Sequence, residues 1–198
     1  SLQGSHEGDS LLETFLDTMA DQWKTSISVG TGNEGADGGH VSGNLVMGSV
    51  QEIDLAIGEN EPSTSVQLWK SYADSFDVLL LTPWGTVLGP MRRIDQVQRF
   101  QARNTDVLVY YGSPSPYSAA QEIYFEFLPR ESVLDSGIWT FRLVPRKIVT
   151  GRFDFWLPSG QARNPDTPFL RQTPDTTLTI PSAAGKVIAV GAYDSRND

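Results

Sequence analysis

The chain has 198 residues, of which 39% are hydrophobic and 20% are charged. This composition is typical of a globular protein with one large domain or two small ones. The formal net charge of −9 argues against binding to nucleic acid or to an anionic membrane surface. The absence of cysteine excludes disulfides and a thiol nucleophile, and no apolar run is long enough to span a membrane.

Residues 10–24 carry the signals of an amphipathic helix. Ser10 and Glu13 form the S-x-x-E pattern of a capping box at its start. Apolar residues then recur at the spacing of one helix face, which we expect to be buried against a sheet: Leu12, Phe15, Leu16, Met19 and Trp23. A β-branched strand, residues 25–29, follows at once, so this part of the chain predicts an α/β unit.

The predicted strand runs into a glycine-rich turn that carries Asn33 at its tip. Gly30, Gly32 and Gly35 allow backbone conformations that a Cβ would forbid, so Asn33 can lie close to a ligand. A strand that ends in such a turn is suited to aiming a side-chain amide into a cleft. The alternative interpretation is an ordinary loop after a buried strand, and the composition of this stretch alone favours it.

Residues 44–157 show a different pattern, because short alternating or apolar runs follow one another with turn signals between them. About eight β-rich segments predict an all-β sandwich and favour a jelly roll. Aromatic residues recur at every second position within three of these runs, which places each set on one face and predicts a core: Phe125, Phe127, Trp139, Phe141, Phe153 and Phe155.

The α/β pattern returns near the end of the chain. Residues 187–190 form a continuous apolar run closed by glycine, which predicts a strand buried on both faces of a parallel sheet. We therefore expect residues 1–43 and 173–198 to form one α/β part, with residues 44–172 inserted as a β-sandwich.

The two ends together resemble the subtilisin-like serine proteases. In that family a Ser-Leu-x-Gly segment, a helix and a buried strand ending in Gly-Asn precede a Tyr-Pro turn and a run like VIAVGA-x-D. The matching segments of this chain, in the same order, are Ser1-Leu2-Gln3-Gly4, Gly32-Asn33-Glu34-Gly35, Ile180-Pro181 and VIAVGAYD at 187–194. The insert and the TPDTTLTIP segment resemble the clostridial branch, which includes spore-germination subtilases. The resemblance implies a partial subtilisin-like α/β sandwich with discontinuous ends and an inserted jelly roll.

By this resemblance Asn33 is the donor of an oxyanion hole. A preorganised amide N–H aimed at the developing oxyanion lowers the barrier of acyl transfer, and in subtilisin the loss of this donor costs roughly 10²–10³ in rate. The resemblance also assigns an edge strand that pairs with substrate and the two walls of the specificity pocket: Ser1, Leu2, Gln3 and Gly4, then Val29, Gly30, Thr31 and Gly32, and Thr179, Ile180 and Pro181. Gln3 and Ile180 differ from the commonest residues of the family, so pocket specificity does not carry over.

The subtilisin triad needs an Asp, a His in a His-Gly-Thr-His segment and a Ser in Gly-Thr-Ser-Met-Ala. These 198 residues contain neither the His segment nor the Ser segment, and the only histidines are His6 and His40. By the resemblance, the triad Asp would also lie in a segment outside these residues. We therefore expect an internal fragment of a serine endopeptidase that is inactive alone. The expected partners are a peptide or protein substrate, the remaining segments of the protease domain and a second copy of the chain. A fragment that lacks neighbouring strands should expose apolar edges around Val187–Val190 and on the Leu12–Trp23 stripe, and we expect a homo-oligomer to cover them.

Other functions stay open at this stage. The sandwich could be a carbohydrate- or protein-binding module, with an aromatic platform as an alternative to core packing: Trp69, Trp84, Tyr110, Tyr111, Trp139 and Trp156. The parent could also be a non-catalytic pseudoprotease. We expect no metal site and no cofactor, with calcium in the parent left open, because two histidines in surface loops and the carboxylates Glu59, Glu61 and Asp74 match no ligand motif. The compartment is equally open: spore-associated, cytoplasmic or secreted.

Overall fold

The computed structural model describes residues 7–32, 38–113, 118–158, 164–173 and 178–191. The chain divides into two compact units, one formed by residues 1–36 and 174–198 and the other by residues 37–173. The first, the α/β unit, contains α1 (Leu11–Trp23), β1 (Ser28–Gly30) and β12 (Ile188–Val190). The second, the sandwich unit, contains β2 (His40–Asn44), β3 (Gln51–Ile57), β4 (Thr64–Ser71), β5 (Ser75–Leu81), β6 (Val87–Met91), β7 (Gln98–Gln101), β8 (Thr105–Tyr111), β9 (Ala120–Pro129), β10 (Gly137–Lys147) and β11 (Arg152–Trp156).

Helix α1 begins at the capping box that the sequence predicts. The Glu13 backbone N–H donates to the Ser10 hydroxyl at 3.3 Å, and the Ser10 backbone N–H donates to the Glu13 carboxylate at 3.2 Å. The helix ends at Lys24, whose left-handed conformation (φ 50°) closes its last turn. In the described ranges no helix is long and apolar enough to cross a membrane.

The apolar stripe of α1 is exposed. The expectation that it packs against a sheet is therefore wrong, whereas the exposure expected of a fragment of an α/β sheet is observed. Leu12, Phe15 and Trp23 are 51%, 58% and 69% exposed, while Leu16 and Met19 are half-buried. The physical reason is the small size of the α/β unit, because its described sheet has only two strands of three residues each. Two such strands offer too little surface to cover a helix of 13 residues.

Strands β1 and β12 pair in parallel, with Val29 opposite Ala189. The parallel pairing agrees with the predicted α/β pattern, but the predicted burial on both faces is wrong. Ile188 and Val190 are each 54% exposed. A parallel strand is buried only where helices or further strands cover its faces, and the described residues of this unit supply no third strand.

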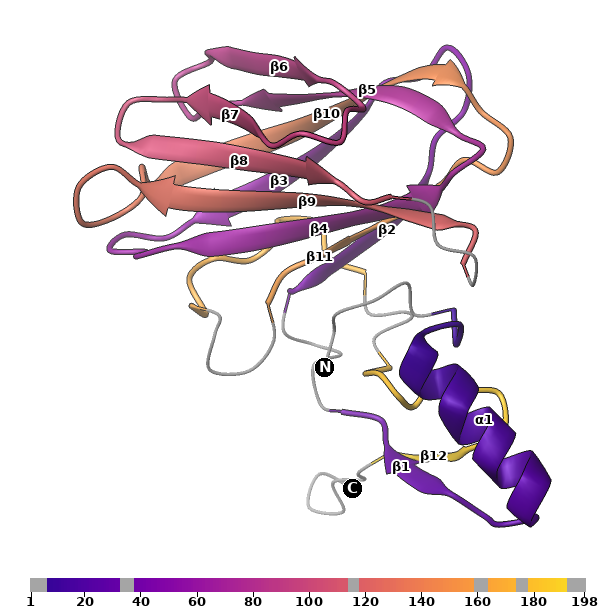
Figure 1. Cartoon of the computed structure of the whole chain (residues 1–198). Coiled ribbons are helices and arrows are strands. Elements are labelled where there is room, and N and C mark those ends of the chain that lie inside the picture. The colour runs from indigo at the N-terminus through magenta and orange to yellow at the C-terminus, as the bar shows by residue number, and fades with distance from the viewer. Residues whose placement is uncertain (1–6, 33–37, 114–117, 159–163, 174–177, 192–198) are drawn as a thin grey trace. The chain divides into compact units, whose positions relative to one another are not determined.

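The sandwich unit consists of two antiparallel sheets (Figure 1). One has the order β3-β10-β5-β6 and the other the order β2-β11-β4-β9-β8-β7. The pairs β3–β10 and β4–β9 join strands that are far apart in the chain, whereas β5–β6 and β7–β8 close as hairpins. The predicted domain boundary after residue 43 falls inside β2, which is a strand of the six-stranded sheet.

The core lies between the two sheets and contains the aromatic residues that the alternation predicts. All six are buried: Phe125, Phe127, Trp139, Phe141, Phe153 and Phe155. Rings from β9 and β10 meet edge to face across the sheets, with centroids 5.0 Å apart for Phe125 and Phe141 and 5.5 Å apart for Phe127 and Trp139. Such edge-to-face pairs add about 0.5–1.5 kcal/mol to the stabilisation by burial.

Candidate functional site

The candidate site in the α/β unit is formed by two segments that lie far apart in the sequence. Thr31 follows β1, and its backbone N–H donates to the Val190 carbonyl at 3.0 Å. The Thr179 backbone N–H donates to the Thr31 carbonyl, also at 3.0 Å. The segments predicted as opposite pocket walls, Val29 to Gly32 and Thr179 to Pro181, therefore lie side by side at the end of β1.

The glycines before Asn33 differ in their conformations. Gly32 has φ 83°, which is strained for any residue with a Cβ, as expected for a tight turn. Gly30 lies in β1 without a positive φ, and a Cβ on it would meet open space, so the expectation of a special conformation there is wrong. Asn33 and Gly35 lie outside the described residues, and so does the predicted edge strand Ser1, Leu2, Gln3 and Gly4.

The second predicted wall is a compact turn. Thr179 and Ser182 are buried, and the Ser182 backbone N–H donates to the Thr179 carbonyl at 2.7 Å. The Ile180–Pro181 peptide bond is cis. The hydrogen bonds from Ser182 to Thr179 and from Thr179 to Thr31 hold the backbone of this segment beside Thr31. Gly191, after β12, lies against the Thr31 hydroxyl.

The sequence did not reveal how α1 contacts the rest of its unit. The Asp17 carboxylate accepts hydrogen bonds from the backbone N–H groups of Gly185 (3.1 Å) and Lys186 (2.6 Å). The Lys186 ammonium also lies 3.2 Å from the Asp21 carboxylate. The polar face of the helix is thus bonded to the turn that leads into β12. The spacing of residues along the helix identifies its polar and apolar faces, but it does not predict which face contacts the rest of the unit.

His40 is buried in β2 rather than in a surface loop, which corrects the prediction. Its ring stacks on Trp156 at 3.7 Å between centroids, with Nε2 3.0 Å from the Asp154 carboxylate and Nδ1 3.2 Å from the Thr173 carbonyl. Burial by itself raises the pKa of Asp154, but hydrogen bonds from His40 and Arg152 bring this pKa below its ordinary value. The cluster fastens β2 to the segment that leaves the sandwich. His6 lies outside the described residues.

The carboxylates weighed for calcium do not form a metal site. Glu59 is exposed, whereas Glu61 and Asp74 are buried. Glu61 accepts a hydrogen bond from the Thr167 hydroxyl at 2.5 Å, and Asp74 binds backbone N–H groups. Across the described ranges, no three His, Asp or Glu residues are grouped so that they could hold a metal ion.

The aromatic residues weighed as a sugar-binding platform do not share one surface. Trp139 and Trp156 are buried. The ring of Trp84 packs against Trp139 and carries the Arg103 guanidinium 4.4 Å from its centroid. Trp139 belongs to the core and Trp84 and Tyr111 pack against it, whereas Trp69 and Tyr110 are half-buried outside it.

Over 97% of its length the chain is similar to part of a clostridial protease. That protein is the CspB protease of Clostridium perfringens, whose solved structure matches with a TM-score of 0.86 at 30% sequence identity. The chain spans 40% of that protein's length. No protein-family model matches the chain, and neither does any curated protein.

Proposed function

We propose that this chain is an internal portion of a subtilisin-like serine endopeptidase and that it supplies the oxyanion donor and the pocket walls. The observation that carries the proposal is the hydrogen bond from Thr179 to Thr31, because it joins the two wall segments beside the turn that precedes Asn33. The similarity to a clostridial protease supports the same conclusion. The nucleophile and its base belong to other segments of the protease.

In the proposed reaction a serine hydroxyl attacks the carbonyl carbon of the scissile peptide, and its proton passes to the base. The carbonyl oxygen becomes an oxyanion, which the Asn33 side-chain amide stabilises by donating a hydrogen bond. Collapse of the tetrahedral intermediate expels the amine, which takes the proton from the base, and water later hydrolyses the acyl-enzyme. This chain therefore contributes by positioning the substrate and stabilising the oxyanion. None of its groups forms or breaks a covalent bond in the proposed reaction.

The proposal is tested in the protein expressed from the complete reading frame. Cleavage of casein and labelling by a fluorophosphonate are expected, since both report a serine nucleophile. Asn33→Ala should lower kcat about 10²–10³-fold with little change in KM, because the oxyanion forms only in the transition state. Asn44→Ala, an exposed asparagine at the end of β2, is the matched control and should leave kcat unchanged.

Two results would count against this function. A loss of less than tenfold in kcat for Asn33→Ala removes the oxyanion role from Asn33. A complete protein that neither cleaves casein nor reacts with the fluorophosphonate removes the endopeptidase activity and favours a pseudoprotease.

For the sandwich unit we propose a bracing role within the protease. The chain enters and leaves this unit at neighbouring points, because the Thr173 backbone N–H donates to the His40 carbonyl at 2.9 Å. Deleting residues 41–172 therefore joins two residues that are already adjacent. The deletion should shorten the half-life of the complete protease on heating, and unchanged stability and cleavage would contradict the bracing role.

A further inference from the structure

At one end of the sandwich the inward-facing positions change from apolar to polar. Lys70 continues the inward row of Val66 and Leu68 in β4, and Gln121 precedes Ile123 in the inward row of β9. Lys70 and Gln121 are direct partners in the β4–β9 pairing, so their side chains lie on the same face of the sheet. Both are buried, although apolar residues would fill these positions at lower cost. Polar residues at core positions point to a use other than packing.

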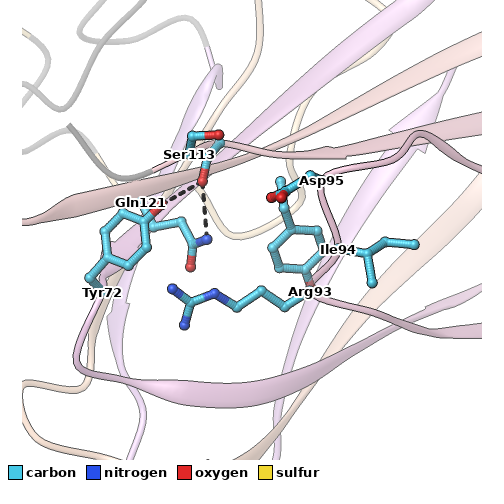
Figure 2. A pocket seen from close by; sticks show the side chains of 8 residues that line it. Tyr72, Arg93, Ile94, Asp95, Ser113 and Gln121 are labelled. Carbon is cyan, nitrogen blue, oxygen red and sulfur yellow. Dashed lines mark hydrogen bonds between the residues drawn. The ribbon is translucent and has the colours of Figure 1, made fainter.

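A cavity of about 160 Å³ lies at this polar end (Figure 2). Tyr72, Arg93, Asp95, Tyr111 and Gln121 are among the residues that line it. Most pockets for drug-sized ligands measure roughly 300–1,000 Å³, so this cavity fits a small molecule or the end of a larger one.

Gln121 lines the cavity and carries a buried acceptor that has no partner among the described residues. The side chain is only 2% exposed, and its Nε2 donates to the Gly112 carbonyl at 3.2 Å. The Tyr72 hydroxyl donates to the same carbonyl at 2.5 Å. A flipped amide would set two oxygens against each other, so the orientation is determined and Oε1 lies on the other side, where it finds no donor among the described residues.

Arg93 provides a cation with free donors beside this acceptor. Its guanidinium lies over the Tyr72 ring, 4.8 Å from the centroid, and Figure 2 shows it extending toward the Gln121 amide. Within the described part of the chain this guanidinium has no ion pair and no hydrogen bond. Stacking on a ring leaves the N–H edge free, which is the arrangement that binds a planar carboxylate with two parallel hydrogen bonds.

Charges of both signs surround the cavity. Burial and, secondly, the charge of Arg93 lower the pKa of Lys70 to about 8, whereas the charge of Asp74 raises it. The Lys70 ammonium is already bonded to the carbonyls of Ser71 and Asp74 at 3.0 and 2.8 Å. Asp95 also lines the cavity and opposes the charge of Arg93, and both side chains are exposed, so water and salt screen both charges.

We propose that this cavity binds the carboxylate of a small hydroxy acid on Arg93, with the neighbouring hydroxyl donating to Gln121 Oε1. The same chemistry occurs in free hydroxy acids and in the uronic acids of acidic glycans. A neutral sugar fits less well, because Arg93 covers a face of Tyr72, and Tyr111 is half-buried with its hydroxyl bonded to the Met91 carbonyl at 3.3 Å. The site is independent of the proposed protease chemistry, since all of its residues belong to the sandwich unit.

The test is an NMR titration of the ¹⁵N-labelled full chain with L-lactate, D-glucuronate, acetate and D-glucose. The side-chain signals of Arg93 and Gln121 should shift saturably with the two hydroxy acids, with a Kd on the order of 1–10 mM. Acetate lacks the hydroxyl and should bind several-fold more weakly, and glucose should produce no saturable shift. The tighter of the two hydroxy acids identifies the source of the ligand.

Variants separate specific binding from general charge attraction. Arg93→Gln should weaken binding of the hydroxy acids at least tenfold, and Gln121→Met should bring their Kd up to that of acetate. Arg92→Gln removes the same charge from the neighbouring exposed position and should change Kd less than twofold. Equal losses in the two arginine variants, binding of glucose as tight as that of glucuronate, or unshifted Arg93 and Gln121 signals at 50 mM ligand would each overturn the proposal.

Discussion

The turn between β10 and β11 is held by one buried carboxylate, and removing it should destabilise the sandwich strongly. Asp74, only 1% exposed, accepts hydrogen bonds from the backbone N–H groups of Val149 (2.6 Å), Thr150 (2.9 Å) and Gly151 (2.8 Å). Burial by itself raises the pKa of Asp74, but these three bonds and the nearby Lys70 charge bring this pKa below its ordinary value.

The magnitude follows from the bonds that each substitution breaks. A hydrogen bond to a charged group contributes about 1.5–3 kcal/mol. Asp74→Asn keeps the side-chain volume and one oxygen but turns an N–H₂ group toward at least one N–H donor. We therefore expect the free energy of unfolding to fall by about 2–3 kcal/mol. Asp74→Ala leaves all three donors unpaired and should cost about 4 kcal/mol, a large part of the roughly 5–15 kcal/mol by which domains are stable.

The assay is urea unfolding followed by tryptophan fluorescence, to which Trp139 and Trp156, both buried in the sandwich unit, contribute. The folded-state pKa of Asp74 is lowered. The contribution of this carboxylate to the free energy of unfolding is therefore complete above its unfolded-state pKa of about 4, and it is lost as the pH falls through the folded-state pKa. The difference between wild type and Asp74→Asn should therefore shrink from pH 7 to pH 3. Asp77→Asn, which breaks the exposed ion pair with Arg146, is the control and should cost less than about 1 kcal/mol.

A loss of unfolding free energy for Asp74→Asn no larger than that for Asp77→Asn at pH 7 would contradict the role of this carboxylate. An equal difference between wild type and Asp74→Asn at pH 3 and pH 7 would also contradict it, because the charge of Asp74 would then contribute nothing.

Three further predictions follow from burial and exposure. The exposed side chains of α1 should make the isolated chain self-associate, and Phe15→Glu combined with Trp23→Glu should give a monomer in light scattering, whereas a monodisperse wild-type monomer would contradict this. Phe141→Ala should cost about 3–5 kcal/mol in urea unfolding, and a loss below about 1 kcal/mol would mean that the core collapses around the cavity. Burial lowers the pKa of Lys70 from 10.5 to about 8, so the folded state binds fewer protons between these values and stability rises with pH there. Lys70→Met should remove this rise, and its unfolding free energy relative to wild type should therefore fall by about 2 kcal/mol from pH 7 to pH 10; an unchanged difference would contradict the buried cation.

Local chemistry explains the elements that can be predicted from the sequence. Ser10 and Glu13 are three residues apart, so the capping box needs no information from the rest of the chain. The alternation of aromatic residues in β9 and β10 likewise follows from the two-residue period of a strand. Both features lie where the sequence predicts them.

The α/β unit shows why amphipathic pattern does not settle burial. The spacing of Leu12, Phe15 and Trp23 identifies an apolar face correctly, but a face is buried only when another surface covers it. The described part of the unit bonds α1 through Asp17 on its polar side instead. The order of motifs along the chain was enough to propose the wall segments at Thr31 and Thr179. The hydrogen bond between them could be found only in the folded structure.

The sequence by itself determined the capped helix, the strand-rich middle and the glycine turn before Asn33, because each depends on residues close together in the chain. Only the tertiary structure decided the burial of His40 beside Asp154, 114 residues away, and the binding of Asp74 to the turn at Gly151. The same holds for the cavity between Arg93 and Gln121. The physical reason is that the pairing of a buried polar group depends on which strands lie side by side, and strand order is set by the packing of whole sheets.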